Sequence, residues 1–264
     1  MTEDIYANDM TSSPRNDASG IRDLTIVDRW NTPLGSPNGG YILTMMIKGL
    51  RAEMDADDPF VASISYLKPP KPGPAELHTS LLRHGRRIQT GEVTLVQAGA
   101  NVAHLVANFG PRVEGEGRSL ELGAAPQLPP PEVCGDPRDS GIPLDGIFGR
   151  TEYRLASRPG WADGAPTGDP TVELWMRLDG GRDIEIEALA FLVDSYAPPV
   201  MEVGENKSMT VQLTVHLHRK PAPGWIAARI TTRHIVNGFH EEDCELWDQA
   251  GNLVAQSRQL AILL

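Results

Sequence analysis

Apolar and polar residues alternate along much of the chain, and two apolar blocks interrupt this alternation. Over residues 209–217 the odd positions are apolar and the even positions polar, which is the period of a strand with one buried face. Residues 40–50 and 184–196 are instead apolar on nearly every side and predict helices buried on most sides. The first block follows the turn-forming Asn38-Gly39-Gly40, and the second must end before Pro198-Pro199.

Several short segments recur in the same order about 150 residues apart, which indicates an internal duplication. Leu67–Gly73 and Leu217–Gly224 both end a predicted strand with basic residues, prolines and a glycine, and Gln97-Ala98-Gly99 recurs as Gln249-Ala250-Gly251. Strand ends and hairpin turns of this kind are also common in unrelated proteins, so chance is the alternative. Each half is predicted to be an antiparallel sheet wrapped around a long helix, which is an α+β architecture.

Two segments lack periodicity and divide the chain. Residues 1–20 are polar and predict a disordered N-terminal tail. Residues 113–146 are rich in proline and glycine, so no helix or inner strand is expected to cross them, and they predict a linker. The predicted domains are therefore residues 21–112 and residues 147–264.

Composition narrows the class of protein. The chain has 264 residues and a formal net charge of −11, and we expect no nucleic-acid partner because neutralising phosphates requires a basic face. No apolar run approaches the roughly 20 residues that span a bilayer, and the first residues lack the order of a secretory signal. We therefore expect a cytoplasmic protein with no membrane partner.

The sequence lacks the common motifs that hold nucleotides, metals or a serine nucleophile. There is no G-x-S-x-G elbow, no G-x-x-x-x-G-K-[ST] loop and no G-x-G-x-x-G fingerprint. Cys134 and Cys244 are far apart in the sequence, and His216 and His218 share a strand face with no further ligand in a suitable pattern. We expect neither a metal nor another cofactor.

Asp194 is the most unusual carboxylate, because it directly follows the apolar run Ala188–Val193. Burial disfavours the ionised form of a carboxyl, and we expect the negative end of the predicted helix to add to this effect. A raised pKa suits a carboxylate for general-base catalysis near neutral pH. The alternative is an exposed aspartate that only begins the turn before Pro198.

Two further polar residues lie on predicted strands. Gln259 falls on the mostly small or apolar face of the last strand, where its amide needs hydrogen-bond partners. Thr210 opens the polar face of the strand over residues 209–217, where its hydroxyl can orient a water molecule or simply meet solvent. Singly, neither residue establishes a site.

Taken in order, several segments of the chain resemble the bacterial acyl-CoA thioesterase II family. The resemblance extends from about Leu24 to the C-terminus and is weakest across the proline-rich segment. It is carried by Pro37–Tyr41, Ser65–Pro69, Ala107–Gly110, Leu174–Arg177, Leu192–Asp194, Thr210–Arg219 and Gly251–Gln259.

The resemblance implies a double hotdog fold, with two antiparallel sheets that each wrap around a long central helix. It also places the catalytic triplet of the family on Asp194, Thr210 and Gln259, which would orient a water molecule toward a thioester carbonyl. Substrate binding is implied for Asn38, Gly39 and Gly40, and Asn38 departs from the residue that many relatives carry there. A homodimer or higher homo-oligomer is implied as well.

The predicted function is hydrolysis of acyl-CoA to a free carboxylic acid and CoA by direct attack of water. One alternative is a hotdog protein that binds acyl-CoA or lipid without catalysis. A second is an enoyl-CoA hydratase or dehydratase, a chemistry that pairs an aspartate with a histidine near the central helix. Neither Gly39–Leu50 nor Ala188–Tyr196 contains a histidine, which argues against this second alternative.

Overall fold

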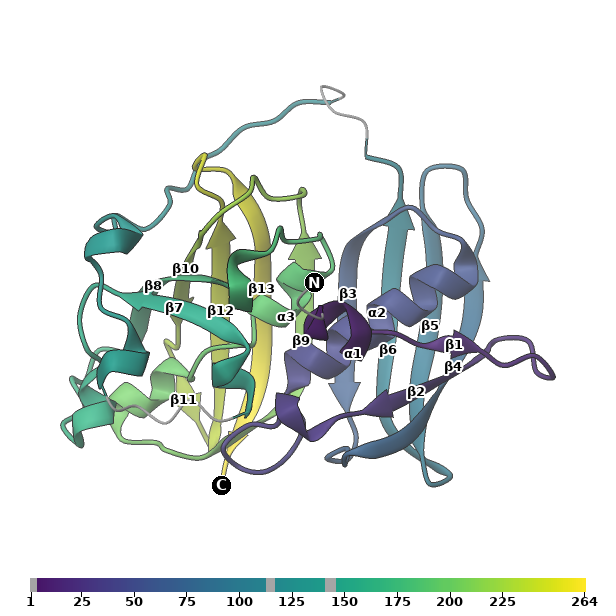
Figure 1. Ribbon diagram of the computed structural model, residues 1–264, viewed down its shortest axis with the longest axis horizontal. Coiled ribbons are helices and arrows are strands. Elements are labelled where there is room, and N and C mark those ends of the chain that lie inside the picture. The colour runs from purple at the N-terminus through teal and green to yellow at the C-terminus, as the bar shows by residue number, and fades with distance from the viewer. Residues whose placement is uncertain (1–3, 113–116, 141–145) are drawn as a thin grey trace.

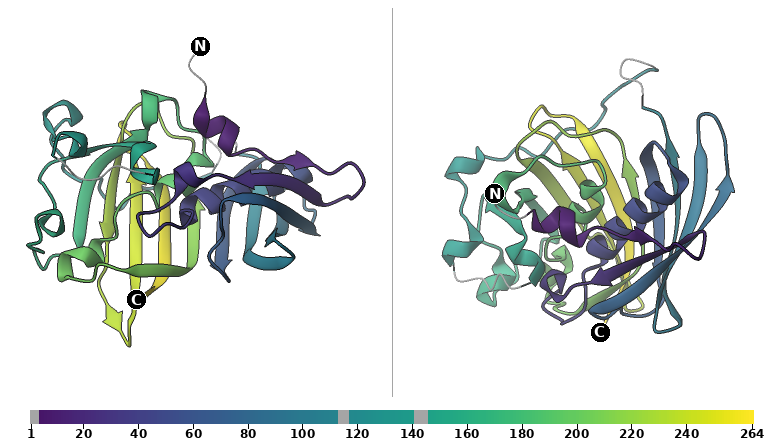
Figure 2. Two further views of the ribbon diagram at one scale, coloured as in Figure 1. Left: turned by 60° about the horizontal axis from the view of Figure 1, so that its bottom comes forward. Right: turned by 45° about the vertical axis from the view of Figure 1, so that its right-hand side comes forward.

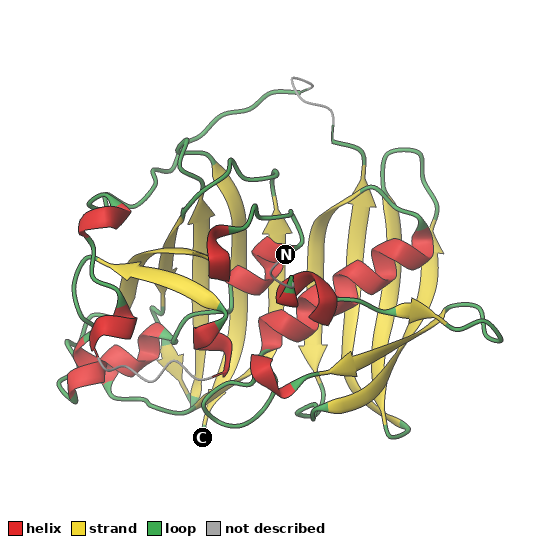
Figure 3. Cartoon of the chain, viewed as in Figure 1, coloured by secondary structure: helices red, strands yellow, loops and turns green. Residues whose placement is uncertain are grey.

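A computed structural model of the chain describes residues 4–112, 117–140 and 146–264. Among these residues, thirteen strands form one continuous antiparallel sheet, and the two central helices lie against one of its faces (Figures 1 and 3). In the first half the strands are β1 (Ser13–Pro14), β2 (Ile21–Ile26), β3 (Asp58–Tyr66), β4 (Gly73–Arg83), β5 (Gln89–Gln97) and β6 (Ala100–Gly110). In the second half they are β7 (Thr151–Leu155), β8 (Thr171–Leu178), β9 (Ser208–Leu217), β10 (Ile226–Thr231), β11 (Ile235–Val236), β12 (Phe239–Trp247) and β13 (Leu253–Leu263).

The two halves of the sheet repeat one topology. Across the first half the order is β1-β2-β4-β5-β6-β3, and across the second it continues as β9-β13-β12-β10-β8-β7, with β11 paired to β12. The turns Gln97–Gly99 and Gln249–Gly251 connect equivalent strands, β5 to β6 and β12 to β13. The predicted duplication is therefore confirmed at the level of topology.

The halves meet where β3 pairs with β9, through residues 61–65 and 212–216 (Figure 1). The prediction of two separate sheets is therefore wrong. An unpaired edge strand exposes a row of backbone N–H and C=O groups, and the pairing of two edges satisfies these groups within the chain. Arg112 reinforces the junction by donating hydrogen bonds to the carbonyl oxygens of Pro59 and His218, each at 2.6 Å.

The long helix α2 (Gly39–Met54) confirms the prediction for the first apolar block. It begins at Asn38, whose side-chain Oδ1 accepts a hydrogen bond from the Tyr41 N–H at 2.9 Å, and it ends at Asp55 in the left-handed conformation. Almost every side chain from Tyr41 to Leu50 is buried, because the sheet curves around the helix.

The central helix of the second half, α3 (Ala188–Leu192), has only five residues, so the long helix predicted there is wrong. The chain before α3 runs along α2 in a non-helical conformation, and Glu185 and Glu187 form ion pairs with Lys48 and Arg51 of α2. Residues 182–185 have no regular structure, and Glu187, directly before α3, already has helical backbone angles.

Residues 4–20 are ordered, which corrects the predicted disordered tail for all but residues 1–3, which lie outside the described part of the chain. Helix α1 (Ile5–Asp9) and strand β1 cross the helix side of the sheet (Figure 2). Tyr6 contacts the rings of Trp30 and Phe191 edge-on, and the Trp30 indole N–H donates to the Asp9 carboxylate at 2.8 Å. Two buried side chains, Tyr6 and Met10, anchor this polar segment.

The predicted linker, residues 113–146, is only partly described, because residues 113–116 and 141–145 lie outside the described residues. Residues 117–140 run over the second half, where the Trp175 indole N–H donates to the Pro129 carbonyl at 2.8 Å. Gly135 pairs with Leu155 as an isolated bridge.

The 3₁₀ helices of the described chain are Asp28–Trp30, Pro131–Val133, Pro137–Ser140, Gly146–Gly149, Gly160–Asp163, Asp179–Gly181 and Pro199–Val203. No described helix has both the length and the apolar character needed to cross a bilayer.

The ordered N-terminal segment leads to a test of stability. We expect Tyr6→Ala to lower the free energy of unfolding by about 3 kcal/mol, because it leaves a cavity against two aromatic rings. Chemical denaturation followed by tryptophan fluorescence measures the change. Asp17→Ala, at an exposed position of the same segment, is the control and should change the stability little. Equal stabilities for the two variants would mean that the segment is disordered in solution.

Candidate active site

The candidate site begins where the second half of the chain meets the start of α2. Asp194 follows α3, and its carboxylate Oδ2 accepts a hydrogen bond from the Gly40 N–H at 2.7 Å. The Asn38 amide donates to the same oxygen at 3.0 Å and to the Asp194 carbonyl at 2.8 Å. The structure therefore joins Asp194 to two of the three residues predicted to bind substrate.

Gly39 and Gly40 allow this close approach. A Cβ atom at Gly40 would lie 2.8 Å from the Phe191 carbonyl oxygen, and one at Gly39 would lie 2.9 Å from the Asp194 carboxylate. The Tyr66 hydroxyl, which donates to the Gly39 carbonyl at 2.8 Å, fixes the backbone from the other side. Any larger residue at these positions would push the carboxylate away from the helix.

Burial raises the pKa of Asp194 to about 6, while the Gly40 N–H and the Asn38 amide act in the opposite direction. The predicted direction of the shift is confirmed, and the alternative of an exposed aspartate is wrong. The expectation that the negative end of the preceding helix adds to this rise is corrected. The Asp194 carboxylate instead faces the positive N-terminus of α2, which favours its ionised form. The group is thus a half-buried carboxyl that is able to change its charge near neutral pH.

Thr210 and Gln259 form a second part of the site, on neighbouring strands of the sheet. The Thr210 hydroxyl donates to Gln259 Oε1 at 2.6 Å, and Gln259 Nε2 donates to Glu242 Oε1 at 2.6 Å. The three side chains come from β9, β13 and β12, with Glu242 directly opposite Gln259 in the register. They form one continuous chain of hydrogen bonds.

Glu242 is the residue that sequence reasoning missed. It is 5% exposed, and its second oxygen, Oε2, is buried without a hydrogen-bond partner among the described residues. Burial and then the nearby charge of Asp194 raise its pKa to about 8, while the Gln259 amide lowers it. Because the charge of Asp194 acts on the pKa of Glu242, the two parts of the site are electrostatically coupled. In β12 every second side chain is buried, and Glu242 falls on this buried face between His240 and Cys244. A period of two in the sequence of this strand was the signal that could have identified Glu242.

Two protein-family models match the sequence of the chain. The family model described as the acyl-CoA thioesterase N-terminal domain matches residues 26–110, and the one described as the acyl-CoA thioesterase C-terminal domain matches residues 125–263. The chain belongs to the acyl-CoA thioesterase family. Within it, the chain is thioesterase II-like, as the solved structures below indicate.

Solved structures of similar proteins agree with this membership. A protein of Thermobifida fusca YX, provisionally named thioesterase II, is 25% identical with a TM-score of 0.88, and the match covers 100% of this chain and 99% of that one. An acyl-CoA thioesterase II of Mycobacterium marinum has a TM-score of 0.73 at 16% identity, with 98% of each chain covered, and so shows the fold alone. Among proteins compared by sequence alone, an uncharacterized protein of Mycobacterium tuberculosis is 29% identical over an alignment of 284 positions, gaps included. The alignment covers 96% of this chain and 94% of that protein.

A hotdog protein of unknown function from Alicyclobacillus acidocaldarius also has a TM-score of 0.88, at 21% identity, over 100% of this chain and 99% of that one. The hotdog architecture is thus established for this thioesterase-family chain. It differs from the predicted form in its single sheet and its short second helix.

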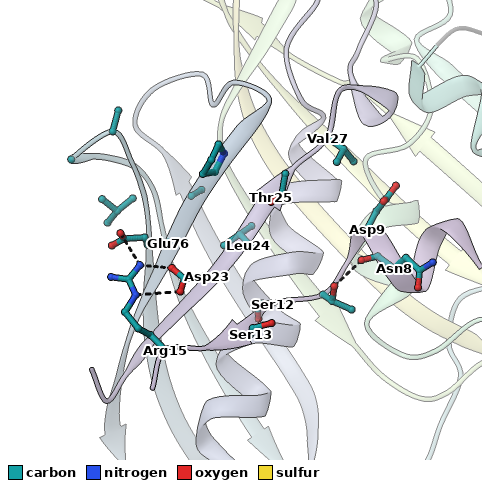
Figure 4. Close-up of a pocket in the computed structure, with 16 residues that line it drawn as sticks. Asn8, Asp9, Ser12, Ser13, Arg15, Asp23, Leu24, Thr25, Val27 and Glu76 are labelled. Atoms are coloured by element: carbon teal, nitrogen blue, oxygen red, sulfur yellow. Dashed lines mark hydrogen bonds and ion pairs between the residues drawn. The ribbon is translucent and has the colours of Figure 1, made fainter. Parts of the chain in front are cut away.

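A groove of about 840 Å³ lies elsewhere in this thioesterase-family chain, between the N-terminal segment, β2 and the start of β4 (Figure 4). Arg15 spans it by ion pairs to Asp23 and Glu76, so one cation lies between two carboxylates there. None of the candidate site residues lines it. Over the described residues, no group of three or more His, Cys, Asp and Glu side chains is arranged to hold a metal ion.

The contact between Asn38 and Asp194 in this thioesterase-family chain is open to a direct test. We expect Asn38→Asp to keep the acceptor that caps α2 but to replace the amide donor with a second carboxyl. The pKa of Asp194 should then rise above its value of about 6, because a like charge disfavours ionisation. An NMR titration of the Asp194 carboxyl measures this value, with exposed Asn16→Asp as the control. An unchanged pKa would show that Asn38 does not contact the carboxylate in solution.

Proposed function

We propose that the chain hydrolyses acyl-CoA thioesters to a free carboxylic acid and CoA by direct attack of water. The observation that carries the proposal is the half-buried carboxyl of Asp194, which accepts a hydrogen bond at the N-terminus of α2 and has a pKa of about 6. Thr210, Gln259 and Glu242 form a chain of hydrogen bonds, and the pKa of Glu242 responds to the charge of Asp194. Membership of the acyl-CoA thioesterase family supports the choice of substrate class.

In the proposed first step, Asp194 accepts a proton from water while the water oxygen bonds to the thioester carbonyl carbon. The Thr210 hydroxyl oxygen accepts a hydrogen bond from the second hydrogen of that water. Its own O–H donates to Gln259, so the lone pairs on its oxygen remain available as acceptors. With both hydrogens held, the oxygen lone pair of the water is free to point at the carbonyl carbon.

The attack converts the carbonyl oxygen into an oxyanion, which backbone N–H groups at the start of α2 are placed to stabilise. The Gly40 N–H already binds Asp194, whereas no described residue accepts a hydrogen bond from the Gly39 N–H. We therefore assign the oxyanion contact first to Gly39, with Asn38 and Gly40 shaping the site around it. Collapse of the intermediate breaks the C–S bond, and the departing sulfur takes the proton that Asp194 received.

The surrounding hydroxyl and thiol groups favour water over an acyl-enzyme route. Burial and nearby carboxylates raise the pKa of the Cys244 thiol well above its usual value, which disfavours the nucleophilic thiolate. The Ser195 hydroxyl is buried and donates to the Leu192 carbonyl at 3.0 Å. Among the described residues, no histidine is hydrogen-bonded to either group to activate it as a nucleophile.

We expect Asp194→Asn to lower kcat/KM for acyl-CoA hydrolysis by about a thousandfold, since it removes a general base but leaves an oxygen that accepts from the Gly40 N–H. Release of free thiol from a panel of acyl-CoAs measures the rate. Asp183→Asn, at an exposed position before α3, is the matched control and should retain wild-type activity. Full activity of the Asp194 variant would rule out its role as base. Tight binding of acyl-CoA by the wild type without thiol release would favour the non-catalytic alternative.

The pH dependence offers an independent test. Because the base must be ionised to accept a proton, we expect kcat/KM of the wild type to rise with pH through an apparent pKa of about 6 and to approach its maximum near pH 7. Rates at constant ionic strength between pH 4.5 and 7.5 measure this limb. A profile that is flat over this range would contradict the assignment of Asp194.

A further inference from the structure

Glu242 occupies a position that the proposed reaction does not yet use. It lies on the buried face of β12 and receives the Gln259 amide at 2.6 Å, at the far end of the hydrogen-bond chain from Thr210. An ionisable group that is 5% exposed is costly to bury, and its free oxygen makes the cost greater. No ion pair with a Lys, Arg or His of the described residues offsets this cost.

We propose that Glu242 is a positioning residue of the site, which fixes the orientation of the Gln259 amide and thereby the direction of the Thr210 hydroxyl. This inference rests on the proposed hydrolytic function. It adds a fourth residue to the predicted triplet and gives Gln259 an indirect role.

The argument follows from donors and acceptors. The two ends of a glutamine amide are unlike, since Nε2 only donates and Oε1 only accepts. Because Glu242 Oε1 accepts from Nε2, the amide must present Oε1 to Thr210. The Thr210 O–H then points away from the reaction centre and leaves its oxygen as an acceptor for water. With the amide reversed, Nε2 would donate to the Thr210 oxygen, and the Thr210 O–H would donate to the water in place of the oxygen accepting from it.

The protonation of Glu242 is set by the groups that surround it. Asp194 faces it from the segment after α3, and its charge opposes the ionisation of Glu242. Across the sheet, β13 presents uncharged Gln259, and β10 presents the non-titrating residues Ile230 and Thr231 opposite the next two positions of β12. The other titratable groups on β12 near Glu242 are His240, Glu241, Asp243 and Cys244. The proton of Glu242 is therefore assigned to the unpartnered Oε2, while Oε1 remains the acceptor for Gln259.

The test uses Glu242→Leu, Gln259→Leu and the double variant, with Glu245→Gln on the outward side of β12 as the control. We expect Glu242→Leu to lower kcat by about ten- to a hundredfold with KM changed less than twofold. Because Glu242 acts through Gln259, the double variant should be no slower than Gln259→Leu alone. Additive losses, or an unchanged kcat in Glu242→Leu, would overturn the proposal.

The conservative variant Glu242→Gln separates positioning from packing. It keeps the shape and an acceptor oxygen but cannot ionise, so we expect nearly wild-type activity near pH 7. In the wild type, ionised Glu242 and ionised Asp194 repel each other, and we expect kcat to fall with an apparent pKa of about 8. This alkaline limb should vanish in Glu242→Gln. An alkaline limb that persists in that variant would belong to another group and contradict the proposal.

A readout without catalysis keeps the inference distinct from the proposed function. The side-chain NH₂ resonances of Gln259, assigned by their loss in Gln259→Leu, should exchange slowly with solvent in the wild type and rapidly in Glu242→Leu. This result, together with an absence of hydrolysis, would refute the function but keep the positioning role. Unchanged exchange in Glu242→Leu would refute the positioning role whatever the activity.

Discussion

The hydrogen bond between the Asp194 carboxylate and the N-terminus of α2 is the constraint around which the site is organised. It connects residues 154 positions apart in the sequence, one from each half of the duplicated chain. A buried carboxylate is unfavourable unless donors compensate for the lost water, and the first N–H groups of a helix are donors without partners in the helix itself. Each group thus satisfies a need of the other, and the two halves must stay in register for this to happen.

The duplication has produced two halves with different tasks. The first half supplies a long helix with a glycine-rich start, and the second supplies polar side chains on inward-facing strand positions. Counted from the shared Gln-Ala-Gly turns, Gln259 corresponds to Ala107. The strand partner of Gln259 is Glu242, whereas the strand partner of Ala107 is Gly91. Ala107 is fully buried, so the first half has core packing where the second half has the amide. Within the sheet, the buried polar side chains of the candidate site therefore come from the second copy of the fold, while the first copy supplies the helix N-terminus.

The sequence predicted the features that depend on local pattern. Asp194 stood out because it follows an apolar run, and Gln259 because it interrupts an apolar strand face. In the structure Gln259 is buried and Asp194 is half-buried. The long helix of the first half was found for the same reason. Glu242 was missed because its neighbours Glu241 and Asp243 make the segment look like a solvated acidic strand.

Other errors came from contacts that local pattern does not contain. The pairing of β3 with β9 joins edges far apart in the chain, and no periodicity reports it. The second helix is short, and Glu185 and Glu187 before it form ion pairs with α2 that the local pattern does not contain. The alternation Ile184-Glu185-Ile186-Glu187 was itself a signal against a long helix there. The ordered N-terminal segment depends on two apolar residues among polar ones, too few to raise its average hydropathy.

The different hydrogen-bond donors of Asp194 and Glu242 explain how a single negative charge is tolerated in the site. Asp194 has the helix N-terminus and an amide as donors, whereas Glu242 has one amide only. Asp194 therefore ionises first, and its charge then holds the proton on Glu242. Near neutral pH the site contains one carboxylate and one carboxylic acid, which limits the cost of desolvation to one charge. The same order of ionisation suits the water attack proposed above, which needs an ionised base on the helix side and an uncharged anchor on the sheet side.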